Sequence, residues 1–278
     1  MDIRAEFHCH STASDGLMTP SKVIQEAKRL NLKSIALTDH DTTRGLDEAE
    51  KEATKLGITF IPGIELSCDY KGATIHLLGY FKDDSYKNIE LQNFLDNLDK
   101  KRILRAKKIV NNLKTYFDID IKYEKVLEKG NGIIARPHIA QTIIEVGYDY
   151  QWDYIFEHFI GDNSPAYVPN EKLDVRDGIK LLKKFNALVV LAHPKLIKKA
   201  PVSEVLDFDL DGVEAIYFQN TQFETNEYIS YALKNNMLIT CGSDCHGGFE
   251  NDTKHGYIGD MTIKEFYYNN FFEEYNRK

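Results

Sequence analysis

Two histidines near the amino end of the chain, His8 and His10, have the spacing of a metal-binding pair. Side chains alternate between the two faces of a β-strand, so these two imidazoles project together while Cys9 points the other way. Asp15, in the turn expected after this strand, can add an oxygen ligand. A single His-x-His pair is weak evidence, because buried strands also contain such pairs by chance.

The stronger indication is that metal-ligand residue types recur after other apolar segments of the chain. Short runs of β-branched and aliphatic residues predict buried strands, and each run ends in an imidazole or a carboxylate. The residues concerned are His40, Glu65, His76, His193, Asp244 and His246. In barrels of alternating strands and helices, active sites form at the carboxyl ends of the strands. We therefore expect one shared site, in which imidazoles mixed with carboxylates suit zinc, manganese or iron.

The composition limits the class of protein. At 278 residues and 42% hydrophobic content, the chain is long enough for an α/β barrel with an inserted subdomain, or for two ordinary domains. Its net charge of −8 argues against non-specific binding of long nucleic acids. No apolar run approaches the roughly 18–20 residues of a membrane span, and the start lacks a signal-peptide pattern. The four cysteines lack Cys-x-x-Cys spacing, so we expect reduced, buried thiols and a cytoplasmic location.

The alternation of strand and helix signals is typical of an α/β fold. Thr19 and Pro20 fit an N-cap and the first residue of a helix, and Gly57 fits a C-cap. Later strands are expected at 33–38, 58–69, 73–81, 187–192, 212–217 and 237–241. Helices are expected near 20–31, 43–56, 174–185 and 224–235. Between about 84 and 175 the pattern changes to helices, which predicts an insert within a barrel formed by residues 1–83 and 176–278.

The insert contains two groups of basic residues with uncommon positions. Arg102 and Arg105 lie in an apolar helical stripe, where an unpaired charge would be costly to bury. Either they form internal salt bridges or extend their charged ends to solvent, or one of them reaches a phosphate in the cleft. Arg136, Pro137 and His138 open a further helix, whose free amide donors and positive dipole end could hold a phosphate. The alternative is a purely structural helix cap.

Taken together, these segments resemble the PHP (polymerase and histidinol phosphatase) superfamily of metal-dependent phosphoesterases, over most of the chain. The similar segments are 7–16, 37–43, 62–65, His76, 191–194 and 242–246. Glu6 is a departure, since an aspartate commonly precedes the first histidine pair; we expect it to affect a contact behind the ligands. Within the superfamily, the segments 14–16, 102–105, 136–138 and 165–169 resemble the nucleoside 3′,5′-bisphosphate phosphatases and 5′-3′ exoribonucleases.

The resemblance implies a distorted seven-stranded β/α barrel with a mainly helical insert, 84–175, that covers the active site. It also implies two or three divalent ions, of manganese, zinc or iron. The implied ligand sets are His8, His10, Glu65 and Asp244 for the first ion, Asp15, His40 and His246 for the second, and Glu65, His76 and His193 for the third. Asp15, His193 and His246 are the implied catalytic residues. Arg136, His138, Arg102 and Arg105 are the implied phosphate-binding residues.

The expected function is hydrolysis of phosphate monoesters by a metal-bridging hydroxide, on the 3′-phosphate of nucleoside 3′,5′-bisphosphates. The alternatives are a 5′-3′ exoribonuclease acting on short 5′-phosphorylated RNA, a histidinol phosphatase or protein-tyrosine phosphatase relative, and a non-catalytic nucleotide-binding domain. A β/α-barrel amidohydrolase also begins with His-x-His, but such enzymes often bridge their metals through a carbamylated lysine. The expected partner is a small phosphorylated substrate, a nucleotide or short oligoribonucleotide, with no membrane and no stable protein partner.

Overall fold

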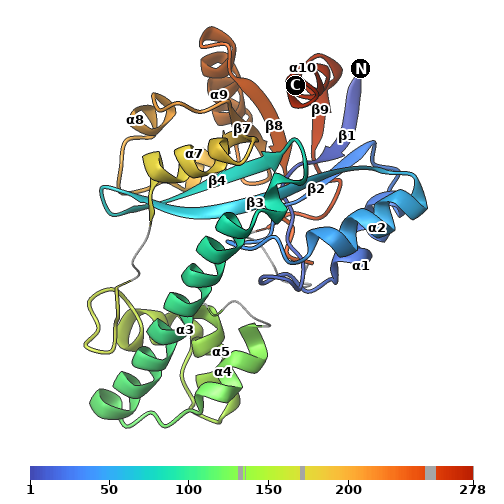
Figure 1. The fold of residues 1–278 in the computed structure, drawn as a ribbon. Coiled ribbons are helices and arrows are strands. Elements are labelled where there is room, and N and C mark those ends of the chain that lie inside the picture. Colours follow the sequence, from blue (N-terminus) through green and yellow to red (C-terminus); the bar gives the residue numbers. More distant parts are fainter. Residues whose placement is uncertain (131–133, 135, 170–172, 248–254, 278) are drawn as a thin grey trace. The chain divides into compact units, whose positions relative to one another are not determined.

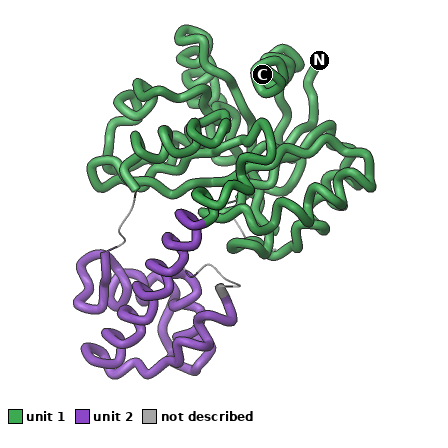
Figure 2. Tube along the Cα trace, viewed as in Figure 1, with its two compact units in different colours: residues 1–92, 172–278 green, residues 93–171 purple. Residues whose placement is uncertain are grey.

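The computed structural model describes residues 1–130, 134, 136–169, 173–247 and 255–277. The chain divides into two compact units, drawn in different colours in Figure 2. Unit 1 comprises residues 1–92 and 172–278, and unit 2 comprises residues 93–171. Unit 1 contains all of the strands found in the described residues, whereas unit 2 is helical.

Unit 1 is built on one sheet, in which seven strands form a nearly closed barrel (Figure 1). In spatial order these strands are β8 (Leu238–Gly242), β7 (Gly212–Tyr217), β6 (Ala187–Leu191), β4 (Ala73–Phe81), β3 (Thr59–Tyr70), β2 (Ser34–Leu37) and β1 (Asp2–Glu6). The amide of Phe7 donates to the carbonyl of Cys241 at 3.1 Å, which joins the end of β1 to β8. The predicted distorted seven-stranded β/α barrel is confirmed. Two short strands, β5 (Leu173–Asp174) and β9 (Thr262–Lys264), extend the sheet beside β3 and β1.

The barrel is distorted because β4 runs antiparallel to both of its neighbours, β3 and β6. A tight turn at Lys71 and Gly72, with φ values of 51° and 80°, joins β3 to β4. The sequence pattern placed His76 at the carboxyl end of a strand, and this was wrong: β4 continues to Phe81. Because β4 is reversed, its amino-terminal half lies at the same edge as the carboxyl ends of the parallel strands. The amide of Ala192 donates to the carbonyl of His76 at 3.1 Å, which fixes this alignment.

Helices pack around the strands of unit 1 (Figure 1). They are α1 (Pro20–Arg29), α2 (Leu46–Leu56), α7 (Val175–Lys184), α8 (Val202–Leu206), α9 (Gln222–Lys234) and α10 (Glu265–Tyr275), with short 3₁₀ turns η1 (Asp84–Lys87) and η3 (Pro194–Leu196). The predicted signals at α1 and α2 are confirmed. The Thr19 hydroxyl accepts from the amide of Lys22, Pro20 is the first helical residue, and Gly57 has a left-handed φ of 62°.

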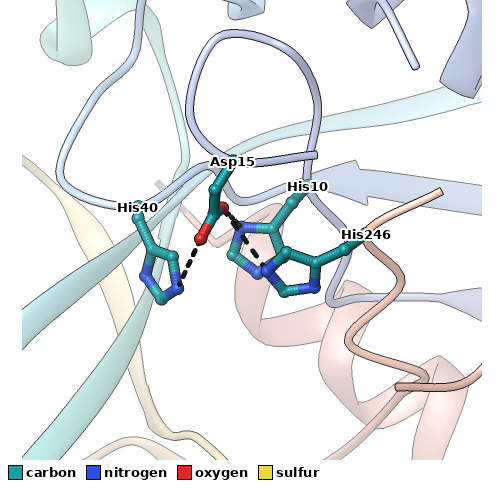
Figure 3. Close-up of side chains that lie close together, drawn as sticks. All are labelled: His10, Asp15, His40 and His246. Carbon is teal, nitrogen blue, oxygen red and sulfur yellow. Dashed lines mark ion pairs between the residues drawn. The ribbon is translucent and has the colours of Figure 1, made fainter. Parts of the chain in front are cut away.

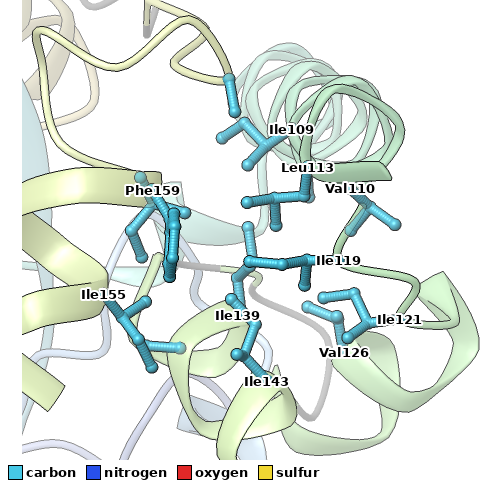
Figure 4. Close-up of a cluster of buried hydrophobic side chains, with 14 of the residues drawn as sticks. Ile109, Val110, Leu113, Ile119, Ile121, Val126, Ile139, Ile143, Ile155 and Phe159 are labelled. Atoms are coloured by element: carbon cyan, nitrogen blue, oxygen red, sulfur yellow. The ribbon is translucent and has the colours of Figure 1, made fainter. Parts of the chain in front are cut away.

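Unit 2 has a core of its own, made by helices and the turns between them (Figure 4). Its elements are α3 (Ile89–Phe117), which crosses the division between the units, α4 (Tyr123–Gly130), α5 (Arg136–Glu145), α6 (Trp152–Tyr154) and the π-helical turn η2 (Ile155–Phe159). Ile109 and Leu113 of the predicted apolar stripe are fully buried against Ile139, Ile143 and Ile155. This independent core explains why the helical pattern of the insert was recognisable in the sequence.

All four cysteines are buried free thiols, as predicted. Among the described residues, no helix combines the length and the apolar character that crossing a membrane requires. The cytoplasmic location stays a prediction.

The carboxyl-terminal helix α10 was not predicted, yet it completes the barrel core. Phe271 is fully buried, and its ring centre lies 4.7 Å from that of Phe7 and 5.3 Å from that of Tyr80.

We expect Phe271→Ala to lower the free energy of unfolding of unit 1 by about 3–5 kcal/mol, because it leaves a cavity beside the first strand. Urea unfolding followed by tyrosine fluorescence measures the loss.

The matched control is Phe266→Ala, on the same helix but 63% exposed, which should change stability by less than about 0.5 kcal/mol. Equal effects of the two substitutions would contradict this role of α10.

Candidate metal centre

Side chains from six separate segments meet at one edge of the barrel. His8 and His10 follow β1, His40 follows β2, Glu65 lies in β3, His76 lies in β4, His193 follows β6, and Asp244 and His246 follow β8. Backbone bridges pair His40 with Glu65 and Cys9 with Cys245, so the segments after β2 and β8 are held in register with their neighbours. Cys9 lies between His8 and His10, and Cys245 lies between Asp244 and His246. Both cysteines are buried, as expected for side chains that alternate between the two faces of a strand.

The Glu65 carboxylate is the centre of this arrangement. It is fully buried, and its two oxygens face different groups of imidazoles. Oε2 lies 3.3 Å from His8 Nε2, 3.2 Å from His10 Nε2 and 2.9 Å from His40 Nδ1. Oε1 lies 2.8 Å from His76 Nδ1 and 2.9 Å from His193 Nε2. One carboxylate therefore joins the two sides of the site.

A first cluster of possible ligands contains His8, His10, Glu65 and Asp244, all of them buried. Asp244 Oδ1 lies 3.4 Å from His8 Nε2 and 3.1 Å from His10 Nε2. Two imidazoles and two carboxylates thus meet from β3 and from the segments that follow β1 and β8. This is the set implied for the first ion.

A second cluster contains His10, Asp15, His40 and His246 (Figure 3). Asp15 Oδ1 lies 3.4 Å from His246 Nε2 and 3.7 Å from His10 Nδ1, while Oδ2 lies 3.8 Å from His40 Nε2. The set implied for the second ion is therefore gathered here, with His10 added to it.

Glu65, His76 and His193, the set implied for the third ion, also converge. In addition to their contacts with Glu65 Oε1, His76 Nδ1 and His193 Nε2 lie 3.4 Å apart. His40 is close enough to Glu65 and His76 to form an alternative cluster with them. All nine residues that the sequence pointed to as ligands thus lie in one connected group.

The donor atoms fit divalent cations. His8 Nε2, both ring nitrogens of His10 and Glu65 Oε2 are buried, and none of them makes a hydrogen bond among the described residues. Polar atoms buried in this way are costly, and a bound cation would satisfy several of them at once. Imidazoles with carboxylates, and no thiolate among the clusters, match the preferences of zinc, manganese and iron.

The carboxylates of the site are kept ionised by their neighbours. Burial opposes ionisation of Glu65, but the imidazoles of His40, His76 and His8 outweigh it and hold its pKa well below the usual value. Burial also opposes protonation of His246, yet Asp15 raises the pKa of this imidazole to about 9. Without a metal, the raised pKa of His246 favours its protonated form, and a bound cation would take over that positive charge.

Glu214, in β7, supports the site and was missed by the sequence reasoning. It is fully buried; His8 Nδ1 lies 3.0 Å from its Oε1, and the amide of His193 donates to its Oε2 at 2.8 Å. A carboxylate behind a ligating histidine fixes the ring so that the other nitrogen faces the metal. Gly242 leaves room for it, because a Cβ there would collide with Glu214 Oε1 and His8 Cβ. In the sequence, Glu214 is a charged residue within an otherwise apolar strand, and this feature could have identified it.

Two more buried carboxylates hold the loops that carry the ligands. Asp39 accepts hydrogen bonds from the hydroxyls of Ser11 and Ser14, at 2.7 and 2.6 Å, and so shapes the loop that carries Asp15. Glu6 accepts from the Ser243 hydroxyl at 2.6 Å and from the His8 amide at 3.2 Å. Burial raises the pKa of Glu6 to about 7 against these hydrogen bonds. Glu6 therefore acts behind the ligands, as its position in the sequence suggested.

In unit 2, Arg105 and Arg136 both contact the ring of Tyr167, with guanidinium carbons 5.7 and 5.5 Å from the ring centre. Arg105 Nε donates to the Val168 carbonyl at 2.7 Å, and Arg136 Nη1 donates to Asp162 at 2.8 Å. Burial and the neighbouring Arg136 lower the pKa of Arg105. The guanidiniums thus have structural partners, and two positive groups are still held close to each other.

Arg102 and His138 belong to the same unit, on α3 and α5. Helix α5 begins at Arg136, as predicted, while Ala135 lies outside the described residues.

Comparisons with known proteins give a consistent result. The PHP domain family model matches residues 6–155. The 5′-3′ exoribonuclease of Haemophilus influenzae is 28% identical over 256 residues, which cover 88% of this chain and 91% of that protein. The 3′,5′-nucleoside bisphosphate phosphatase of Chromobacterium violaceum is 27% identical over 271 residues, which cover 92% of each protein.

Solved structures share the fold. A candidate metal-dependent phosphoesterase of Bifidobacterium adolescentis matches with a TM-score of 0.81 at 25% identity, over 97% of this chain and 96% of that one. An amidohydrolase of Chromobacterium violaceum, with bound sulfate and no metal, matches with a TM-score of 0.79 at 25% identity, over 94% and 91%. Since the family match covers more than half of the sequence and includes the first four ligand segments, this chain belongs to the PHP domain family.

Proposed function

We propose that this chain removes the 3′-phosphate from nucleoside 3′,5′-bisphosphates. As a member of the PHP domain family it is a metal-dependent hydrolase of phosphoric esters. The choice of substrate is supported by the Chromobacterium violaceum phosphatase, which aligns along 92% of both proteins. The observation that carries the proposal is the convergence of five imidazoles on the two oxygens of one buried carboxylate, Glu65.

Family membership implies divalent metal cofactors, and we propose two or three ions of manganese, zinc or iron. The proposed ligands are His8, His10, Glu65 and Asp244 for the first ion, Asp15, His40 and His246 for the second, and Glu65, His76 and His193 for the third. When bound, such ions lower the pKa of water and neutralise charge on the phosphoryl oxygens.

Hydrogen bonds within the chain fix the orientation of the histidine rings around these ions. His246 Nδ1 donates to the Asp244 carbonyl at 2.8 Å, which leaves Nε2 facing Asp15. Glu214 does the same for His8, leaving Nε2 toward Glu65. We assign Asp15 to orienting His246, and His193 to protonating the leaving oxygen of the ester through Nδ1, the ring nitrogen that does not face Glu65.

A 5′-3′ exoribonuclease acting on short 5′-phosphorylated RNA is the second candidate. It is favoured by the Haemophilus influenzae relative, whose identity and coverage match those of the phosphatase. An amidohydrolase reaction has less support. Glu65 occupies the central, joining position, and no lysine is buried among the residues that the structure describes.

The metal centre can be tested through Glu214, which touches its ligands but belongs to none of the clusters. Glu214→Gln keeps the volume and removes the charge that holds His8, so we expect metal affinity to fall about 10- to 100-fold. Titration with Mn²⁺ followed by electron paramagnetic resonance measures it. Glu227→Gln, an exposed carboxylate on α9, is the control. An affinity within twofold of the wild type would remove Glu214 from the site.

The reaction can be tested with adenosine 3′,5′-bisphosphate. We expect orthophosphate and adenosine 5′-phosphate as products, loss of activity after chelation, and recovery on adding Mn²⁺, because the ions neutralise the phosphoryl charge. Chromatography of the products identifies which phosphate leaves. Orthophosphate released only from histidinol phosphate, or activity that resists chelators, would refute the proposal. Faster turnover of a short 5′-phosphorylated RNA would make the exoribonuclease the primary function.

We also propose that the paired guanidiniums of Arg105 and Arg136, with Arg102 and His138, bind a phosphate of the substrate. Arg136→Ala should raise KM for the bisphosphate by about tenfold or more, because a charge-assisted hydrogen bond is lost. Metal content should stay at the wild-type level. Steady-state kinetics of Arg136→Ala are compared with those of Arg29→Ala, an exposed arginine on α1 that pairs with Glu26. Unchanged KM would exclude Arg136 from binding.

A further inference from the structure

A column of three imidazoles leads outward from the metal centre. The ring of buried His10 stacks on that of His246, with centroids 4.1 Å apart and planes at 20°. The ring of His255 packs against that of His246, with centroids 4.2 Å apart and planes at 36°. His10 is fully buried, whereas the side chain of His246 is 13% exposed and His255 is half-buried. The column thus leads from a buried ring to two partly exposed rings.

His255 lies beside the candidate metal ligands. The three clusters of possible ligands found among the described residues do not include it, although its ring packs against His246, a member of one of them. The sequence reasoning did not select it either, because no apolar strand precedes it. Its position beside His246 therefore calls for another explanation.

The backbone fixes His255 in this position. The amide of Gly256 donates to the Ser243 carbonyl at 2.8 Å, which ties the segment to the residue before Asp244. Gly256 also lies directly on the ring of Phe218, since an added Cβ would come within 2.7 Å of its Cδ2 atom. Phe218 follows β7 and is 36% exposed. Two contacts thus hold the residue next to His255, and they require glycine there.

We infer that His255 stacks on the nucleobase of the substrate. Imidazole is one of the planar side chains on which unstacked bases lie in proteins, and such stacking tolerates any base. In a nucleotide the base is separated from the 3′-phosphate by one ribose. A phosphate bound at His246 and its neighbours therefore brings the base near the next ring outward in the column. This inference rests on the proposed function, and it adds that His255 recognises the nucleobase of the substrate.

The test compares two substrates, adenosine 3′,5′-bisphosphate and its abasic analogue, 1-deoxyribose 3,5-bisphosphate. The readout is the ratio of their kcat/KM values. We expect His255→Ala to reduce this preference for the nucleotide about tenfold. His255→Phe keeps a stacking ring without the polar nitrogens, so it should retain most of the preference. A role in only covering His246 would lower kcat/KM for both substrates alike.

Gly256→Ala and His158→Ala complete the design. Gly256→Ala displaces the segment from Phe218 and should reduce the preference as His255→Ala does, whereas His158→Ala, a stacked surface histidine in unit 2, should leave it unchanged. An unchanged ratio in His255→Ala, or a loss in His255→Phe as large as in His255→Ala, would overturn the inference while the proposed function stands. If the wild type hydrolyses neither substrate, the proposed function fails and the inference falls with it.

Discussion

The rest of the structure depends on keeping one carboxylate charged in the interior of the barrel. Glu65 is fully buried, and five imidazole nitrogens lie within 3.3 Å of its two oxygens. An ionised carboxylate without compensation costs several kcal/mol at such a place. At Glu65 this cost is offset by positive charge, carried either by protonated imidazoles or by metal ions. The fold must therefore deliver histidines from many strands to one point, and this requirement fixes where each strand ends.

The reversed strand β4 is the feature that meets this requirement. In a fully parallel barrel, every ligand would come from the loop after a strand. Here β3 and β4 form a hairpin, so Glu65 and His76 face the site from within neighbouring strands. Ligands inside strands are held more firmly than ligands on loops. The buried carboxylates of Glu214 and Glu6 then hold the segments that do leave the sheet, through the amides of His193 and His8.

The sequence was informative about the proposed ligands because all of them except Asp15 lie within or close after an apolar run that predicts a strand. It could not predict the direction of β4, since alternation of side chains is the same in parallel and antiparallel strands. The helix α10 was missed because its aromatic residues cover the barrel at several angles and give no simple stripe. Glu214 and His255 were missed for a different reason. Their roles come from contacts with residues far away in the chain, and no local spacing records such contacts.

The backbone conformation of two proposed ligands shows how firmly the centre is built. His193 has a φ of 26° and Asp244 a φ of 55°, both in the left-handed region that costs a non-glycine residue on the order of 1–3 kcal/mol. The amide of His193 donates to Glu214 and that of Asp244 to the His8 carbonyl, so the surroundings hold each one in place. A rigid centre of this kind suits any phosphoryl group. Our proposals therefore assign the selection among phosphate esters to groups outside it, the arginines beside Tyr167 and the outer imidazole of the histidine column.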